Sequence, residues 1–569
     1  MHPLVWLAIF SVVWGAVIPF SSAKHPRSGN PPSSWGDIQK QRRLSRAGLT
    51  NDGTAALWPL PQQSNFKSKL LLIEDFRFTV KGPSCSILDA AIQRYYGIIF
   101  GKDWRQVVEK SENNATDRRI PALSRLYVTL NPQNPCSDTD YPDVDMDEHY
   151  EIIINDPTFS SVLVGNTVWG AVRGLETFSQ LIWRLDDGRL VINQSMVVDW
   201  PRFSHRGLML DTSRHFISKR IILQNLDAMA MNKYNVFHWH IVDDQSFPYQ
   251  SRTFPDLSTL DIAEVIEYAR VRGIRVIAEF DTPGHATSWG YALSKLLTPC
   301  YTNGSADGSF GPINPILNST YDTLTDFFTE ILEVFPDRYL HLGGDEVDFT
   351  CWQSNPAITA FMKKKGFGKD YAQLEEYYVQ TLIDLLDKIP STPRKGKAKA
   401  DKHEYIVWQE VFDNNVQLDN DTIVHVWKDL KDWKGVEWQK EIANVTKAGY
   451  RSILSSCWYL NYISYGADWT AYYNCDPQQF NGSAAQKELV IGGETCMWGE
   501  YIDDTNVLVK LWPRASAVAE RLWSDQTVTD TNLAGKRLRR HRCLMDRRGI
   551  PAEPNLGPDF CQPEYSSSK

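Results

Sequence analysis

The sequence predicts a (β/α)8 barrel that follows a smaller α+β domain, and two patterns in the second half of the chain carry this prediction. After Trp200-Pro201, short β-rich runs occupy residues 207–213, 234–244, 275–285, 339–347, 404–412, 422–428, 451–460 and 490–500. Most are separated by amphipathic helical stretches, for example 218–233, 261–273, 321–335 and 506–523. Eight strands that alternate with helices are what a closed parallel barrel needs. The connection after the fifth run is too short for a full helix, so we expect it to be irregular.

The residues before the barrel divide into three segments. Residues 1–23 contain the apolar run from Leu4 to Phe20 followed by small residues, which is typical of a cleaved secretory signal peptide; an uncleaved membrane anchor is the alternative. Residues 24–66 are rich in Pro, Ser, Gly and basic residues, which indicates a leader or a poorly ordered arm. In residues 67–200, strands are predicted at 69–80, 125–132, 149–156 and 160–165, and helices at 86–100 and 167–185. Residues 201–569 form the predicted barrel.

Composition excludes several classes of protein. The chain has 569 residues, 42% of them hydrophobic and 23% charged, which favours a globular protein over disorder or a coiled coil. A net charge of −9 argues against a nucleic-acid partner, and no second apolar run could insert stably in a membrane. The 20 Trp, 24 Tyr and 24 Phe exceed the usual need of a core and suggest a ligand with flat apolar faces, such as a sugar ring.

Cysteines and glycosylation sequons both indicate the secretory route. The nine cysteines show no C-x-x-C and no zinc-type spacing, which favours disulfides over metal ligation. Sequence neighbours suggest the pairs Cys85–Cys136, Cys300–Cys351, Cys457–Cys475 and Cys543–Cys561, and leave Cys496 as a buried thiol. Seven N-x-S/T sequons predict glycosylation at Asn114, Asn193, Asn303, Asn318, Asn420, Asn444 and Asn481.

The predicted strands begin with apolar residues and end in groups that can do chemistry. These groups are Asp211 and Arg214, Asp243 and Asp244, Asp281 and His285, Asp345 and Glu346, Trp408 and Glu410, Trp427, Trp458 and Tyr459, and Trp498 and Glu500. In a parallel barrel all these ends meet at one face, where barrel enzymes place their active sites. The sequence therefore predicts an active site at that face.

Clustered carboxylates with aromatic walls favour acid/base cleavage of a glycosidic bond. The chain has no Ser or Cys nucleophile in a recognisable setting and no Gly-rich phosphate loop after a strand. A rival class is a metal-dependent barrel hydrolase, because His238-x-His240 places two histidines on one face of a strand. No third and fourth ligands stand out, so core or supporting histidines are the favoured interpretation.

Seven blocks of the sequence resemble glycoside hydrolase family 20, and closely the animal lysosomal β-N-acetylhexosaminidases. The blocks, in the family's order, are RGLMLDTSRHF, NVFHWHIVDD, AEFDTPGH, LHLGGDEVDFTCW, VWQEVF, WYLNYISYG and CMWGEYID. The resemblance covers the chain from about residue 50 to its end. It implies hydrolysis of terminal β-linked N-acetylglucosamine or N-acetylgalactosamine with retention, in which the substrate's own acetamido oxygen is the nucleophile and no metal or cofactor takes part.

The resemblance also implies three catalytic residues. Glu346 would be the general acid and then the base, a role that calls for a raised pKa. Asp345 would stay ionised and hold the acetamido N–H, while the Tyr459 hydroxyl would orient the acetamido oxygen. Because alternation would point adjacent Asp345 and Glu346 to opposite faces, we expect the strand to bend or end at Gly343-Gly344.

Further substrate contacts follow from the same resemblance. Trp408, Trp427 and Trp498 would box the acetamido methyl and the sugar ring, and Arg214 and Glu500 would bind ring hydroxyls. The remaining implied positions are Asn461 beside the sugar and Asp243 and His285, which would support Glu346.

The chain departs from the family in three places. The loop after Leu257 is short, which opens the rim or impairs the site; in the latter case the protein would bind glycans without hydrolysing them. Tyr462 stands after Asn461 where chains that accept sulfated sugars have Arg, so sulfated substrates are not predicted. The basic run 394–402 is extra and is expected to be a solvated loop.

The expected partners are the glycan substrate and a second subunit, in a homodimer or in a heterodimer with a related chain, by resemblance to the family. We expect the secretory pathway to carry the protein to the lysosome or out of the cell.

Overall fold

The computed structural model describes residues 57–101, 120–155, 157–185, 188–253, 262–293, 295–390, 402–429, 437–462, 464–558 and 560–561. The predicted signal peptide and most of the predicted arm lie outside these ranges. The loop after Leu257, the basic run up to Asp401 and the sequon at Asn114 also lie outside them. Among the described residues, no helix is both long and apolar enough to cross a membrane.

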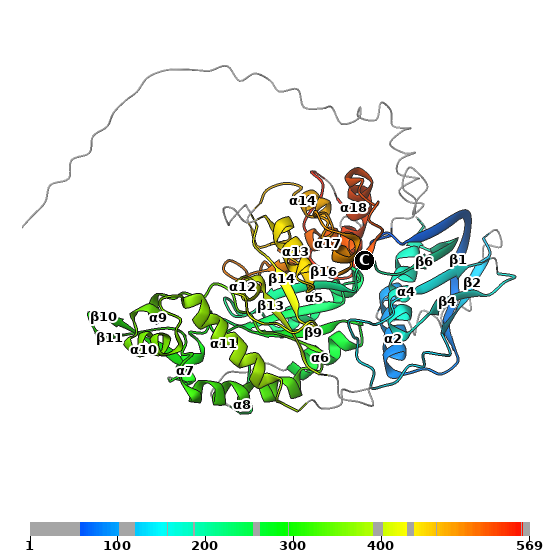
Figure 1. The fold of residues 1–569 in the computed structure, drawn as a ribbon. Helices are drawn as coiled ribbons and strands as arrows, with labels where there is room; N and C mark the ends of the chain where they lie inside the picture. Colours follow the sequence, from blue (N-terminus) through cyan, green and yellow to red (C-terminus); the bar gives the residue numbers. More distant parts are fainter. Residues whose placement is uncertain are drawn as a thin grey trace, which may run out of the picture.

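An α+β unit precedes the barrel and lies beside it in Figure 1. Its strands are β1 (Gln63–Lys81), β2 (Ala122–Leu130), β3 (Tyr150–Ile154), β4 (Ser161–Gly165), β5 (Trp183–Arg184) and β6 (Leu190–Asp199), and its helices are α2 (Ser86–Phe100) and α4 (Val168–Leu181). The sheet order is β1-β2-β4-β3-β6-β5, and the long β1 also pairs antiparallel with β6. Ile87 of α2, Leu175 of α4 and Leu126 of β2 share one hydrophobic core. Each predicted strand and helix of this unit is present, but the helix predicted at 167–185 ends at Leu181, and Trp183–Arg184 form β5.

The barrel closes through eight parallel strands, as the eight sequence runs predict. They are β7 (His205–Asp211), β8 (Val236–Val242), β9 (Arg275–Phe280), β12 (Tyr339–His341), β13 (Glu404–Trp408), β14 (Ile423–Val426), β15 (Arg451–Leu454) and β16 (Val490–Met497). The closed order is β12-β13-β14-β15-β16-β7-β8-β9, so β16 pairs with β7 and each other strand pairs with its neighbour in the chain. An additional hairpin of β10 (Leu297–Thr302) and β11 (Ser305–Ile313) extends from the connection after β9.

Helices connect the strands. They are α5 (Lys219–Met231), α6 (Ile262–Arg270), α7 (Trp289–Ala292), α8 (Asn318–Val334), α9 (Thr350–Ser354), α10 (Pro356–Lys365), α11 (Tyr371–Leu386), α12 (Gln409–Asp413), α13 (Trp438–Lys447), α14 (Trp469–Asn474), α15 (Ala484–Glu488), α16 (Val507–Leu511), α17 (Arg514–Trp523) and α18 (Thr531–Arg547). The single helix expected at 506–523 is two helices, because Pro513 lacks an N–H and interrupts the turn between α16 and α17. After β13 the chain forms only the single turn of α12, in line with the short connection.

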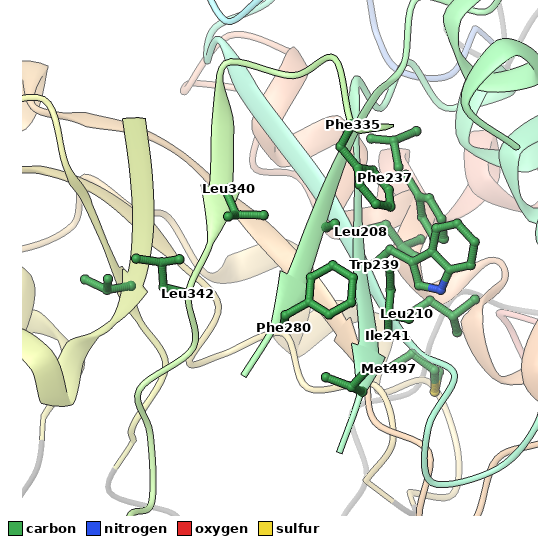
Figure 2. Close-up of a cluster of buried hydrophobic side chains, with 14 of the residues drawn as sticks. Leu208, Leu210, Phe237, Trp239, Ile241, Phe280, Phe335, Leu340, Leu342 and Met497 are labelled. Atoms are coloured by element: carbon green, nitrogen blue, oxygen red, sulfur yellow. The ribbon is translucent and has the colours of Figure 1, made fainter. Parts of the chain in front are cut away.

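The barrel strands have an apolar outer face and a mixed inner face. Outward side chains such as Leu210, Trp239 and Met497 form one cluster with the helices (Figure 2). At the amino end of the strands the interior holds a largely apolar layer, whose members on the strands are Val236, Ile277, Tyr339, Ile406, Ile423 and Ile453. Nearer the carboxyl ends this layer gives way to buried histidines and glutamates, which matter for the site described next.

Disulfides and buried ion pairs tie the chain together. The four disulfides are those that sequence order suggests, and Cys496 is a buried free thiol. Between the two units, the buried carboxylate of Glu148 lies 2.7 Å from Arg173 Nε in α4 and 2.6 Å from Arg206 Nη2 in β7. The α+β unit is thus anchored to the barrel by a charged group that water does not reach.

Candidate active site

The polar and aromatic residues from the strand ends gather at one end of the barrel. Parallel strands place their carboxyl ends at the same face, and each of these residues lies at or just after such an end. The side chains in mutual contact there are Asp211, Arg214, Asp243, His285, Asp345, Glu346, Trp408, Trp427, Tyr459 and Trp498. The structure therefore brings together most of the residues that the sequence singles out.

A left-handed turn after β12 presents the two adjacent carboxylates. The strand ends at His341, and Gly343, Gly344 and Glu346 have φ angles of 71°, 95° and 49°. A Cβ on Gly343 would lie 1.8 Å from Asp281 Oδ1, so only glycine fits there. The Gly344 N–H donates to the same oxygen at 2.8 Å. The expected end of the strand at the glycine pair is thus confirmed.

Glu346 faces an imidazole that is held by a further carboxylate. Its Oε2 lies 3.6 Å from His285 Nε2, and His285 Nδ1 lies 3.2 Å from Asp243 Oδ1. Burial alone would lower the pKa of His285. The contacts with Asp243 and Glu346 raise this pKa instead, so the ring is an imidazolium.

The pKa of Glu346 differs from the expectation. The contact with the His285 imidazolium lowers the pKa of Glu346, whose side chain is 42% exposed, whereas the sequence argument called for a raised value. The physical reason is that an adjacent cation stabilises the carboxylate while water still reaches it.

Asp345 is buried against a second carboxyl group. Atoms of Asp281 and Asp345 lie within 4.8 Å of each other and of His285, and Asp281 Oδ2 and Asp345 Oδ1 are buried without another hydrogen-bond partner. Burial raises the pKa of both groups, and it raises that of Asp281 well above its usual range. Two carboxylates this close share a proton. The pKa of Asp281 is raised the further of the two, which favours Asp281 as the protonated member and Asp345 as the ionised one.

Arg214 bridges two buried carboxylates at the rim of the site. Its Nη1 donates to Asp211 Oδ2 at 3.0 Å, and its Nη2 lies 2.7 Å from Asp243 Oδ2. Burial by itself would lower the pKa of Arg214, but these carboxylates and the nearby Glu500 raise it. Glu500 is exposed. The guanidinium also lies 4.9 Å from the Trp498 ring, so it is oriented from two sides.

Four aromatic rings form a continuous wall. Trp408 lies 6.4 Å from Trp427 and 6.1 Å from Trp498, measured between ring centroids. Tyr459 stacks on Trp427 at 6.2 Å and lies 6.4 Å from Trp498. A backbone bridge to Cys496 in β16 fixes the main chain at Tyr459. The wall has the size and flatness to contact a pyranose ring.

Three acids orient these groups: Asp281 and Glu279 are buried, and Glu410 is half-buried. The sequence placed Asp281 and Glu410 at strand ends of this face without giving them a role, and it did not single out Glu279. Asp281 holds the turn and faces Asp345. Glu410 accepts from Trp427 Nε1 at 2.9 Å, and Glu279 accepts from Trp408 Nε1 at 2.7 Å. The sequence does hold a signal for Glu279. It lies on β9 two residues before Asp281, and residues two apart along a strand point to the same face, so the two side chains point inward together.

The histidines of β8 belong to the barrel interior. His238 lies with His341 and His425, with nitrogen atoms within 4.8 Å, a set that could in principle hold a metal ion. Both nitrogens of His238 face carboxylates, however, because Nδ1 lies 2.7 Å from Glu494 Oε2 and Nε2 lies 3.0 Å from Glu279 Oε2. A nitrogen engaged by a carboxylate offers no lone pair to a metal ion, so the interpretation as supporting histidines fits these contacts better.

A cavity of about 420 Å³ extends from Glu346 toward the β10–β11 hairpin. Glu346 and His285 line one end, and Tyr301, Phe310 and Asp348 line the remainder. Asn461 has a buried Oδ1 with no partner among the described residues, and Tyr462 stacks on Tyr459 at 5.8 Å.

Of the sequons in the described part of the chain, most have an exposed asparagine. These are Asn303, Asn318, Asn420, Asn444 and Asn481. Asn193 is half-buried, and its Nδ2 donates to the Lys67 carbonyl at 2.9 Å.

Comparisons with known proteins place these observations in context. The profile of the family described as "Glycosyl hydrolase family 20, catalytic domain" matches residues 203–526, and the one described as "beta-acetyl hexosaminidase like" matches residues 57–181. The chain is 50% identical over 533 residues to beta-hexosaminidase subunit alpha of Bos taurus, covering 90% of this chain and 96% of that protein. It is 49% identical over 529 residues to beta-hexosaminidase subunit beta of Homo sapiens, covering 90% of each.

Solved structures agree in fold. The Flavobacterium johnsoniae chitobiase has a TM-score of 0.72 and 27% identity, covering 87% of this chain and 73% of that one. An exo beta-N-acetylglucosaminidase of Vibrio harveyi, solved with N-acetylglucosamine, has a TM-score of 0.70 at 22% identity, covering 88% of this chain and 78% of that one.

Proposed function

The chain belongs to glycosyl hydrolase family 20, and we propose that it is a β-N-acetylhexosaminidase. It hydrolyses terminal non-reducing β-linked N-acetylglucosamine or N-acetylgalactosamine of glycoconjugates or chitooligosaccharides. The single observation that carries this proposal is the Asp345–Glu346 pair on its left-handed turn, beside the aromatic wall of Trp408, Trp427 and Trp498. The Tyr459 ring, next to Trp427 and Trp498, completes that wall.

In the first step the acetamido oxygen of the substrate attacks C1, and the bond from C1 to the leaving oxygen breaks. Glu346 gives its proton to that oxygen, which departs into the cavity lined by Tyr301 and Phe310. The resting pKa of Glu346 is lowered, so a bound sugar must raise it by displacing water from the exposed part of its side chain.

The two groups that assist the nucleophile are Asp345 and Tyr459. Asp345, ionised beside the protonated Asp281, accepts from the acetamido N–H and balances the positive charge of the oxazolinium ring. Burial raises the pKa of Tyr459 well above its usual range, so its hydroxyl keeps its proton and donates to the acetamido oxygen.

In the second step Glu346, now a carboxylate, takes a proton from water while the water oxygen bonds to C1. The bond from C1 to the acetamido oxygen breaks, which returns the acetamide and leaves a β-anomer. Two inversions at C1 give retention. Arg214 and Glu500 bind the ring hydroxyls, while Asp243 and His285 hold Glu346 in place.

The test is release of the chromophore from an aryl β-N-acetylglucosaminide at acidic pH, with and without a chelator. Wild-type turnover insensitive to chelator, lost in Glu346→Gln, supports the proposal. In Asp345→Asn, hydrolysis falls while binding of N-acetylglucosamine persists. A folded wild-type protein that binds the sugar and releases no chromophore would refute it.

We also infer that the chain works as a dimer in an oxidising compartment. The two relatives described above are named as subunits, which supports assembly with a second copy or with a related chain. The four disulfides and the exposed sequons support passage through the secretory pathway to the lysosome or the cell exterior. The mass in solution, and glycosidase treatment of the protein from its native source, test these two points.

A further inference from the structure

A single buried carboxylate, that of Glu279, touches both halves of the active site. It lies on β9 inside the barrel and is fully buried. Its Oε1 accepts from Trp408 Nε1 at 2.7 Å, and its Oε2 lies 2.6 Å from His240 Nδ1. The first contact holds the innermost ring of the aromatic wall. The second begins a line of groups that leads to the carboxylate pair.

From His240 the contacts continue without a gap to Glu346. His240 Nε2 lies 3.0 Å from Asp243 Oδ2, and Asp243 Oδ1 lies 3.2 Å from His285 Nδ1. His285 Nε2 is buried with no hydrogen bond and lies 3.6 Å from Glu346 Oε2. Carboxylate and imidazole therefore alternate from the barrel interior to the catalytic acid.

We propose that Glu279 is a positioning residue that sets the sugar-binding surface of Trp408 and, through His240, Asp243 and His285, the placement of Glu346. This inference rests on the proposed function, because it assigns Glu346 the proton transfer. One rigid group then fixes the distance between the sugar ring and the proton donor, which is the geometry that acid catalysis requires.

The charges along the line agree with this role. Burial alone would lower the pKa of His240, but the carboxylates of Glu279 and Asp243 raise this pKa to about 10, so His240 is an imidazolium. Despite its burial, contacts with His341 and His240 hold the pKa of Glu279 well below its usual range. A neutral side chain at this position would leave the His240 cation without its strongest partner. The titratable groups that interact with this pair from the surrounding strands are Asp211, His238, Asp243, Asp281, His341, Asp345 and Cys496.

Glu494 provides a matched control within the same interior. It is as buried as Glu279, and its two oxygens lie 2.7 Å from His205 Nε2 and 2.7 Å from His238 Nδ1. It contacts neither Trp408 nor His240. The His238 ring separates Glu494 from Glu279, whose Oε2 lies 3.0 Å from His238 Nε2. Replacing Glu494 with Gln therefore removes an equally buried charge but none of the groups on the line to Glu346.

The experiment compares two aryl β-N-acetylglucosaminides with wild type, Glu279→Gln and Glu494→Gln. The dinitrophenyl glycoside has a leaving group that departs without a proton, whereas the methoxyphenyl glycoside needs general-acid help. In Glu279→Gln we expect kcat/KM for the methoxyphenyl substrate to fall at least about tenfold more than for the dinitrophenyl substrate. KM for both should rise, because the single amide oxygen of Gln can accept from Trp408 Nε1 or from His240 Nδ1 but not from both. In Glu494→Gln the two substrates should be affected equally, whatever the loss of thermal stability.

An unchanged substrate ratio in Glu279→Gln would overturn the inference. If that variant does not fold, Glu279→Asp decides. It keeps the charge but is too short to reach both Trp408 and His240, so KM or the ratio must change, and wild-type values for both would also overturn the inference. Wild type that releases neither phenol would instead refute the proposed function, so the two failures are distinguishable.

Discussion

Replacing Asp281 with Asn tests whether this buried acid carries the proton of the pair that it forms with Asp345. Asn can accept from the Gly344 N–H through Oδ1, as Asp281 does at 2.8 Å, and can donate to Asp345 through its amide. It therefore reproduces a protonated Asp281 in shape, charge and hydrogen bonding. We expect kcat/KM on an aryl β-N-acetylglucosaminide to stay within about tenfold of wild type.

Asp281→Ala is the contrasting variant. It leaves the Gly344 N–H without an acceptor and Asp345 Oδ1 without a donor, and each unpaired buried group costs about 1–3 kcal/mol. Asp345 is then no longer held in place for the transition state. A cost of this size in activation free energy lowers kcat/KM by at least about tenfold.

The pH dependence of stability gives an independent readout. In the unfolded chain Asp281 titrates near about pH 4, whereas burial raises its pKa in the folded protein. Between these two values the folded state holds the extra proton, so the free energy of unfolding falls by about 1.4 kcal/mol per pH unit as pH rises. Asn has no proton to lose. The melting temperature of Asp281→Asn, relative to that of wild type, should therefore rise as the pH is raised above about 4.

Two results would refute this reasoning. One is a melting-temperature difference between Asp281→Asn and wild type that stays constant with pH. The other is a loss of kcat/KM in Asp281→Asn as large as in Asp281→Ala. Either would mean that Asp281 is ionised in the folded protein.

Three further predictions concern the turn, the acid and the junction between the two units. Gly343→Ala should lower kcat/KM at least about tenfold, because its Cβ would lie 1.8 Å from Asp281 Oδ1. Gly366 also has a left-handed backbone but has open space around it, so Gly366→Ala should lose only about 1 kcal/mol of stability and no activity. His285→Asn removes the cation that lowers the pKa of Glu346, so the alkaline limb of the kcat/KM profile should move to higher pH; an unmoved limb would argue against Glu346 as the titrating acid. Glu148→Gln leaves Arg173 and Arg206 buried without their counter-charge, so the free energy of unfolding in urea should fall by about 3–5 kcal/mol, with KM unchanged at low temperature.

The barrel was predictable because its strands combine two regular signals. Each run is apolar at its start and ends in polar residues, and the helical stretches between them show the period of a helix. The same regularity located Glu346 and His285 at one face before any contact was known. The helix at 506–523 was predicted as one because the apolar period continues through Trp512-Pro513, although proline breaks the hydrogen bonding.

The sequence placed Asp281 and Glu410 at the active-site face, but the roles of the supporting acids could not be predicted, because these roles depend on geometry that no local pattern carries. Asp281 reaches Asp345 only because Gly343 and Gly344 adopt left-handed angles and bring two strand ends together. The sequence of β9 does not distinguish Glu279 from any other polar residue in a strand. Its contact with Trp408 arises only in the barrel, where β9 and β13 flank β12. The lowered pKa of Glu346 likewise follows from the rotamer of His285, which sequence does not specify.

The interior of this barrel has two layers with different roles: one stabilises the fold, and the other positions the residues of the active site. At the amino end of the strands the interior layer is apolar, as close packing favours, with Val236, Ile277 and Ile406 among its members. One layer further along, Glu279 and Glu494 are buried among histidines, although burying charge costs more than burying a methyl group. That cost falls directly beneath Trp408, and each carboxylate there binds at least two rings from different strands. A layer of leucines would pack as densely but could not fix the direction of an indole N–H or the charge of an imidazole. The polar layer is therefore best explained as the rigid base on which the sugar and the proton donor are held at a fixed separation.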